Sequence, residues 1–298
     1  MSSVYLGYML FENGQRTLKA EDNAITEDFL AEIQEKTDRI KEFIYYSIPY
    51  ATVMGNFNDL VHTIEDFEHN YGNSGDYRDC IVHQENINRH LANTLNSFYV
   101  YAERYDRKFA NCDECKRNSD NKRITSKYCD DYFEYRFFYG LRNFTIHAKD
   151  PVGEIQSTRD NQQWHLVISK EHLLTSNKWR SALRKEIENM SGDITNVKSL
   201  IMKAMLRFCE MHREIVNPFI NEMVEIAKFC ISLSKTNDKG ELNFPLIVCF
   251  TTDEKGSQKA NIKDIISNNI LALEMAMSRI NVNLLTGKDF GDEVNYET

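Results

Sequence analysis

Apolar residues recur at spacings of three and four along most of this 298-residue chain, which places them on one face of an α-helix. Residues 77–112 contain neither glycine nor proline and are long enough for a single long helix. The same spacing predicts further helices over residues 25–48, about 126–147, 177–190, 194–234 and about 262–285. We expect Pro49 to end or bend the first of these, Ser126 to cap the 126–147 helix, and Pro218 to kink the helix that contains it.

Extended segments are few. Residues 153–169 hold two short extended runs around a polar turn, which predicts a β-hairpin, and residues 244–252 form one more strand or a buried segment. The fold class is therefore mostly all-α, a helical bundle with long helices. Three segments are expected: an acidic N-terminal helical segment (1–75), a helical bundle with a hairpin insertion at 152–170 (76–235), and a C-terminal segment with a helix and a frayed acidic tail (236–298).

Composition agrees with a helical protein of the cytoplasm. Only four prolines and twelve glycines interrupt the chain, and its seven cysteines lack the even count and regular spacing of a disulfide framework. The N-terminus has no basic segment before an apolar run, and the longest apolar run contains a proline and is too short to cross a bilayer. We expect a cytoplasmic protein with reduced cysteines and no membrane partner.

Charge is unevenly distributed. The net charge of −9 argues against a nucleic-acid partner, but residues 1–70 alone carry thirteen acidic and five basic side chains, a net charge of −8. Residues 104–127 carry eight cations and four acids, and they lead into a stretch rich in aromatic residues. Such a cationic run is ordinarily a solvated surface, although it could also face phosphates.

The stretch EYRFFYGLRNFTIHAKDP, residues 134–151, combines both properties. At about 100° per residue, Phe137, Phe138, Leu141 and Phe144 form a buried arc, and a polar ridge lies opposite. That ridge comprises Arg136, Tyr139, Asn143 and His147, and the long side chain of Arg142 can bend toward it. Gly140 lies beside the ridge, where a missing side chain lets another group approach closely.

Such a ridge suits cleavage of a phosphodiester without a metal. This reaction needs a base for the 2′-hydroxyl proton, an acid for the leaving oxygen and cations for the charge that develops on phosphorus. Histidine titrates near neutral pH and arginine is a planar donor to phosphate. His147 and Arg142 are therefore candidates for these roles.

Spacing alone does not select this pair. An arginine followed five residues later by a histidine occurs three times, as Arg78/His83, Arg142/His147 and Arg207/His212, and Arg159/His165 differs by one position. The polar neighbour Asn143 and the aromatic surroundings favour Arg142/His147, with Arg78/His83 as the second choice. Each of these residues also has a purely structural alternative. His147 could cap the helix or belong to the core, Arg136 could form an ion pair with Asp131 or Glu134, and Tyr139 could be a packing residue.

The segment LRNFTIH resembles the signature of the HEPN superfamily, in which an arginine and a polar residue precede a histidine near the end of a helix in an α bundle. The resemblance covers about eighteen residues, Glu134 to Val152. It implies a metal-independent endoribonuclease without a cofactor, commonly a toxin or phage-defence effector, with a composite site in a homodimer and RNA as its substrate. Arg142 would stabilise the phosphate, Asn143 would orient the phosphate or the histidine, and His147 would act as acid and base.

Two residues extend this assignment from the helical projection alone, namely Arg136 and Tyr139 as substrate-binding residues. An antitoxin or another defence-system protein is a further expected partner. Many HEPN proteins bind without cleaving, so a non-catalytic binding or sensing module, or a scaffold of associating helices, remains the alternative. Cys112, Cys115 and Cys129 lack a fourth ligand for zinc, and we expect no metal site. No sequence motif of a nucleotide hydrolase, esterase or zincin occurs.

Overall fold

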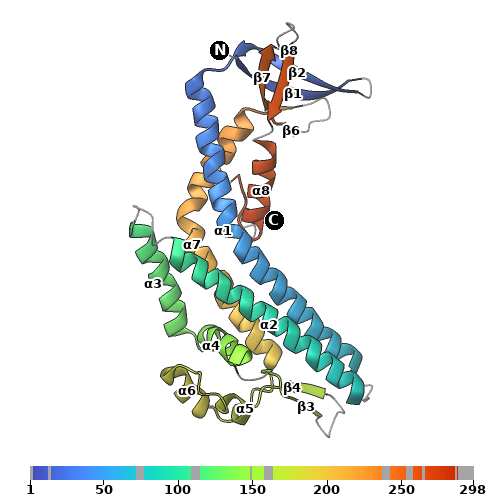
Figure 1. Cartoon of the computed structure of the whole chain (residues 1–298), viewed down its shortest axis with the longest axis vertical. Helices are drawn as coiled ribbons and strands as arrows, with labels where there is room; N and C mark the ends of the chain where they lie inside the picture. The colour runs from blue at the N-terminus through green and yellow to red at the C-terminus, as the bar shows by residue number, and fades with distance from the viewer. Residues whose placement is uncertain are drawn as a thin grey trace, which may run out of the picture. The chain divides into compact units, whose positions relative to one another are not determined.

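The structure is a computed structural model that describes residues 3–12, 15–71, 77–108, 115–147, 150–157, 164–236, 242–252, 258–263, 266–285 and 287. The described residues are mostly helical, as the apolar spacing predicts (Figure 1). They form two compact units, one of residues 1–47 and 216–298 and the other of residues 48–215. The first unit contains both ends of the chain.

A four-stranded antiparallel sheet joins the two ends of the chain in the first unit (Figure 1). Its strands are β1 (Val4–Glu12), β2 (Gln15–Ala24), β7 (Leu246–Thr252) and β8 (Gln258–Lys263), in the order β2-β1-β7-β8. Strand β7 confirms the further strand expected near residue 250, whereas β1, β2 and β8 were not predicted. The short strands β5 (Lys235–Thr236) and β6 (Leu242–Asn243) pair separately.

The C-terminal helix is shorter than the spacing predicts. Helix α8 spans Ser267–Ser278, and Ile262, which was expected to begin it, pairs instead with Val248 across β8 and β7. Pairing with a neighbouring strand satisfies the backbone groups of residue 262, so the helix begins only after the strand has ended. The prediction that this helix begins at about Ile262 is therefore wrong.

Two helices continue through a proline. Helix α1 (Glu27–Asp66) includes Pro49 and is followed by a π-helical turn (Phe67–Tyr71), and α7 (Val197–Ser232) includes Pro218. The expectation that Pro49 could end the first helix is not met. Beyond it, Val53, Phe57, Leu60 and Ile64 are fully buried on one face of α1, and this burial outweighs the backbone hydrogen bond that proline removes.

The unit of residues 48–215 contains the stretch singled out in the sequence. It comprises α2 (Tyr77–Lys108), α3 (Cys115–Asp131), α4 (Phe133–His147), the strands β3 (Glu154–Ser157) and β4 (Trp164–Val167), α5 (Lys170–Leu174), α6 (Ser181–Glu188) and parts of α1 and α7. Strands β3 and β4 pair antiparallel, with Ile155 opposite Leu166, which confirms the predicted hairpin. Helix α5 was not predicted, and α6 is shorter than the 177–190 expected.

One boundary prediction before α4 is wrong. A single helix was expected from Ser126 to His147, but Ser126 lies inside α3, and Tyr132 separates α3 from α4. Helix α3 begins at Cys115, in a polar segment between the predicted helices for which no helix was predicted. That segment holds neither glycine nor proline, so polarity alone did not exclude a helix.

The core of this unit is aromatic. Phe208 of α7 packs against Tyr50, Phe57, Phe98 and Tyr101, with ring centroids 4.7 to 6.4 Å from its own. These rings come from α1, α2 and α7, and Phe57 also stacks on Phe138 of α4. The buried face of α4 is therefore held in place by a packed aromatic core.

Candidate functional site

Helix α4 buries one face and leaves the other partly exposed. Its buried residues are Tyr135, Phe137, Phe138, Leu141 and Phe144. Trp179 stacks on Phe137 and Phe144, with centroids 6.0 and 5.6 Å apart. The buried arc expected from the helical projection is confirmed, and it fixes the direction in which the remaining side chains of α4 point.

Arg142 and Asn143 are in direct contact on the partly exposed face. Arg142 Nη1 donates a hydrogen bond to Asn143 Oδ1 at 3.3 Å, and the guanidinium carbon lies 3.9 Å from the centroid of the Tyr99 ring of α2. The Nε atom is buried and makes no hydrogen bond to any of the described residues. Within the described part of the chain no carboxylate lies within ion-pair distance of Arg142. Its positive charge is thus held by an aromatic face and an amide.

His147 is the last residue of α4 and is exposed. It is not sealed among the phenylalanines of the buried arc. Among the described residues it makes no hydrogen bond to Arg142, whose guanidinium faces Tyr99. The structure therefore places the arginine and the histidine on one helix, with the histidine open to solvent, but does not bring their side chains into contact in a single chain.

The segment after His147 is anchored to α2. Asn88, which is buried, donates from Nδ2 to the carbonyl of Val152 at 2.9 Å and accepts from the Val152 N–H at 3.1 Å. Gln84 Nε2 donates to the same carbonyl at 2.8 Å. The His172 Nε2 atom lies 2.9 Å from the carbonyl oxygen of Asp150. These contacts fix the chain where it leaves the C-terminal end of α4.

Arg136 is engaged by the protein itself. Its Nη2 lies 2.8 Å from Glu186 Oε2, its Nε lies 3.1 Å from both carboxylate oxygens, and Nη1 donates to the carbonyls of Cys129 and Asp130. The ion pair thus forms with Glu186 of α6, rather than with the nearby Asp131 or Glu134 considered from the sequence. A substrate phosphate would have to compete with these five hydrogen bonds.

Tyr139 borders a cavity between α4 and the start of α6. The cavity has a volume of about 260 Å³, and its lining includes Tyr139, Gly140, Asn143, Lys178, Arg180 and Leu183. A Cβ on Gly140 would lie 2.6 Å from Leu183 Cδ2 and 3.1 Å from Trp179 Cζ3. Gly140 therefore does allow a close approach, as expected, and the approaching groups are the side chains of Trp179 and Leu183.

The competing arginine–histidine pairs have different surroundings. His212 is fully buried, stacks on Tyr50 with centroids 3.9 Å apart, and has its Nδ1 2.7 Å from the Tyr101 hydroxyl. Burial lowers the pKa of His212 to about 3, so it is neutral at physiological pH. His83 lies near Phe67 at the start of α2, with Arg78 exposed one turn earlier. Arg159 lies outside the described residues.

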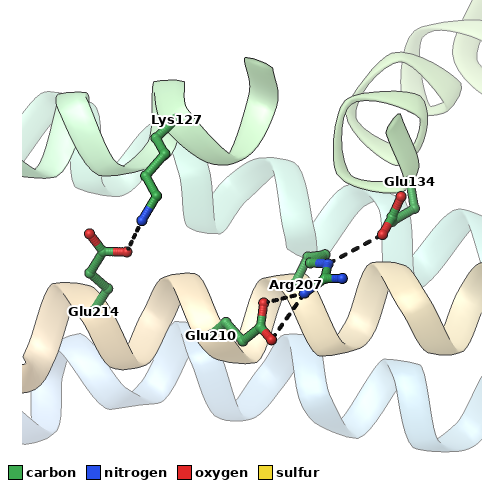
Figure 2. A network of polar contacts seen from close by, with 5 residues as sticks. All are labelled: Lys127, Glu134, Arg207, Glu210 and Glu214. Carbon is green, nitrogen blue, oxygen red and sulfur yellow. Dashed lines mark hydrogen bonds and ion pairs between the residues drawn. The ribbon is translucent and has the colours of Figure 1, made fainter. Parts of the chain in front are cut away.

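Arg207, the partner of His212 in the sequence pattern, is held by two carboxylates (Figure 2). Its Nη1 lies 2.8 Å from Glu210 Oε2, and its Nε lies 3.3 Å from Glu134 Oε1 of α4. Nearby, Lys127 of α3 pairs with Glu214 of α7 at 2.9 Å. This network connects α3, α4 and α7 and neutralises the cations that face it. The Arg207/His212 pair therefore has a structural role.

No metal site is found among the residues described, because no group of three or more histidine, cysteine or acidic side chains is suitably placed. Burial raises the pKa of the Cys129 thiol, which disfavours the thiolate form that binds zinc. Cys112 and the side chain of Cys115 lie outside the described part. Within that part, no helix is both long enough and apolar enough to cross a membrane.

Three residues around Tyr139 were not predicted from the sequence as part of the candidate site, namely Tyr99, Lys178 and Arg180. The Tyr139 ring lies 5.7 Å from that of Tyr99, and the guanidinium carbon of Arg180 lies 5.5 Å from the Tyr139 centroid. The two cations flank Trp179 in the segment NKWR, which is the signal that could have drawn attention to them.

Comparisons of the chain with family models, with curated proteins and with solved structures give no match.

Proposed function

We propose that this chain is a metal-independent endoribonuclease of HEPN type, acting as a toxin or phage-defence effector, with Arg142, Asn143 and His147 as its catalytic residues. The observation that carries the proposal is that the Arg142 guanidinium, within the described part of the chain, is not paired with a carboxylate. Arg136 of α4 forms an ion pair with a glutamate, and Arg207 of α7 forms ion pairs with two, so both charges are neutralised within the protein. Arg142 instead contacts an aromatic ring and an amide oxygen, so its charge remains available for a phosphate.

The exposure of His147 supports the second half of the chemistry. In the reaction, a base removes the proton of the 2′-hydroxyl, the 2′-oxygen bonds to phosphorus, and the 5′-oxygen leaves with a proton from an acid. An exposed imidazole at the end of α4 is accessible for either proton transfer. The guanidinium of Arg142 stabilises the charge that develops on the phosphoryl oxygens.

The separation of these groups supports a composite site in a homodimer. Arg142 faces Tyr99 of its own chain, and in the described part its guanidinium makes no hydrogen bond to His147. Two α4 helices facing each other would bring two exposed imidazoles together, one as base and one as acid. A dimer is therefore part of the proposal, and its mass in solution is measurable by light scattering.

Incubation of the purified protein with RNA in EDTA tests the proposal. We expect cleavage products with 2′,3′-cyclic phosphate ends, and at least a 100-fold loss of rate in His147→Ala and in Arg142→Ala. His62→Ala and Arg89→Ala are matched controls, since both residues lie on exposed faces of α1 and α2 outside the motif. Equal rates in the motif and control variants would contradict the assignment.

The alternative is a module that binds RNA or a partner without cleaving it. The contact of Arg142 with Tyr99 and Asn143 is compatible with this alternative, because a guanidinium held in place with its charge available can bind a phosphate without taking part in catalysis. In that case RNA would stay intact in the assay, while Arg142→Ala would still weaken binding. Growth arrest on expression that His147→Ala relieves would speak for the ribonuclease.

A further inference from the structure

A row of alternating contacts crosses the partly exposed face of α4. The Arg142 guanidinium lies over the Tyr99 ring at 3.9 Å, the Tyr99 ring lies 5.7 Å from that of Tyr139, and the Arg180 guanidinium lies 5.5 Å from the Tyr139 ring. Each of the two neighbouring tyrosine rings therefore has an arginine beside it. The row begins at the proposed catalytic arginine and ends beside the cavity between α4 and α6.

We infer that Arg142, Tyr99, Tyr139 and Arg180 form a platform for single-stranded RNA, which guides one nucleotide beside the cleaved phosphate into this cavity. The inference rests on the proposed function for the identity of the nucleic acid. Aromatic faces bind unpaired bases by stacking, and flanking cations bind the phosphates between them. Bases within a duplex do not offer these faces.

The charges around the cavity fit a phosphate. Lys178 and Arg180 are exposed, and within the described part neither makes an ion pair with a carboxylate. Of the two acids in the lining, Glu186 is paired with Arg136, and Asp130 is exposed. Two uncompensated cations therefore face one carboxylate, and the balance favours an anion.

The cavity is small, so it would take at most one nucleotide of the strand. Its volume of about 260 Å³ lies just below the range of about 300–1,000 Å³ that is usual for drug-sized ligands. A second, smaller cavity of about 150 Å³ shares Cys129, Tyr139 and Arg180 with the first. Tyr139 and Arg180 thus line both cavities, and in the proposed complex a base displaces the exposed Arg180 from the Tyr139 ring.

Binding of 2′-O-methyl RNA tests this inference separately from cleavage, because the blocked 2′-oxygen cannot attack phosphorus. We would measure fluorescence anisotropy of a labelled single strand in EDTA with the full chain. We expect Arg180→Glu and Lys178→Glu each to weaken binding at least 10-fold, and Tyr139→Ala to weaken it about 5-fold or more. Lys185→Glu is the control, since it reverses an exposed charge of α6 outside the cavity and should change binding less than twofold.

The outcomes separate the two proposals. If the single strand binds with this pattern while unmodified RNA stays intact, the platform stands and the ribonuclease proposal fails. If RNA is cleaved but Arg180→Glu binds like Lys185→Glu, the platform is overturned and the ribonuclease stands. Equal binding of a duplex of the same sequence would also overturn it. Arg180→Ala provides a second variant, because an exposed side chain can be removed without loss of folding, and it should lower the salt dependence of binding by about one ion.

Discussion

Arg136 and Glu186 join α4 to α6 through a bidentate ion pair, with Nη2 2.8 Å from Oε2 and Nε 3.1 Å from both carboxylate oxygens. The third nitrogen of the same guanidinium donates to the carbonyls of Cys129 and Asp130, near the end of α3. One side chain thus connects three helices where α3 stops and α4 begins. It satisfies carbonyls that the end of α3 would otherwise leave without partners.

Replacing Arg136 should therefore cost stability beyond that of an exposed ion pair. The side chains of Arg136 and Glu186 are only 22% and 35% exposed, so the pair is partly protected from solvent. We expect Arg136→Ala to lower the free energy of unfolding by about 2 kcal/mol. Arg136→Lys should lose most of the same stabilisation, because an ammonium group cannot reproduce the bidentate geometry. Urea unfolding measures both.

Lys122→Ala on α3 is the matched control, since Lys122 is exposed and its side chain makes no hydrogen bond or ion pair within the described part of the chain. We expect a change within about 0.5 kcal/mol. If Arg136→Ala unfolds at the same urea concentration as Lys122→Ala, the ion pair contributes nothing measurable. The guanidinium would then be available for substrate after all, as the helical projection suggested.

The anchor after α4 gives a graded prediction. Asn88→Ala removes both hydrogen bonds to the backbone of the fully buried Val152, and we expect it to cost about 2–4 kcal/mol because two buried polar groups lose a partner. Gln84→Ala removes one of the two donors to the Val152 carbonyl and should cost about 1 kcal/mol or less. Urea unfolding gives the order, and hydrogen exchange of the Val152 amide reports the anchor directly.

The same order should appear in that exchange rate. The Val152 N–H donates only to Asn88 in the described structure, so its exchange should accelerate in Asn88→Ala and stay near the wild-type rate in Gln84→Ala. Equal exchange in the two variants would mean that the segment after α4 is held by other contacts.

How far the sequence predicts this fold depends on whether a feature is local. The buried arc of α4, the long helices and the hairpin follow from spacing that recurs every few residues, and all three are present. The pairing of β1 with β7 joins residues about 240 positions apart, and no local pattern encodes it. Burial of later residues in α1 kept its helix intact through Pro49, against the local preference of proline.

The candidate site shows the same division. Asn143, His147 and Tyr139 lie on the partly exposed face that the projection predicts for them. The partner of Arg136 was considered on neighbouring turns of the same predicted helix, whereas Glu186 lies fifty residues away on α6. Tyr99 and Arg180 reach α4 from α2 and from the residue before α6, and only tertiary packing brings them beside the motif.

Two glycines should respond in opposite ways to the same substitution. Gly55 lies within α1 on an exposed position, and an added Cβ would meet no atom of the described residues within 4 Å. Gly55→Ala should therefore stabilise the protein by about 0.5–1 kcal/mol, since alanine favours the helix. On Gly140 the added Cβ would lie 2.6 Å from Leu183 Cδ2 and 3.1 Å from Trp179 Cζ3.

Leu183 can move its side-chain end, but Trp179 is stacked between Phe137 and Phe144 and has little room to retreat. Gly140→Ala should consequently destabilise by about 1 kcal/mol in spite of the gain in helix propensity, and Gly140→Val by about 2–3 kcal/mol. Thermal unfolding of the three variants tests the sign. A rise in melting temperature for Gly140→Ala would show that α4 and α6 separate easily.

His212 should make the stability of the protein depend on pH. Burial lowers its folded-state pKa from the ordinary value of 6.5 to about 3, so between these values the unfolded chain binds a proton that the folded chain does not. The stabilising contribution is complete above pH 6.5 and is lost as the pH falls toward 3, by about 1.4 kcal/mol per pH unit.

The variant His212→Asn isolates this effect from the titration of other groups. Asparagine can keep a hydrogen bond to the Tyr101 hydroxyl, which lies 2.7 Å from Nδ1, but it has no proton to gain. The variant should be less stable than the wild type at pH 7.5 because it loses the stacking on Tyr50. Urea unfolding of both proteins between pH 7.5 and 4.5 should show the difference shrinking by about 2–3 kcal/mol. If the two curves stay parallel, His212 gains its proton as readily in the folded chain as in the unfolded one, and the aromatic core around it is open to water.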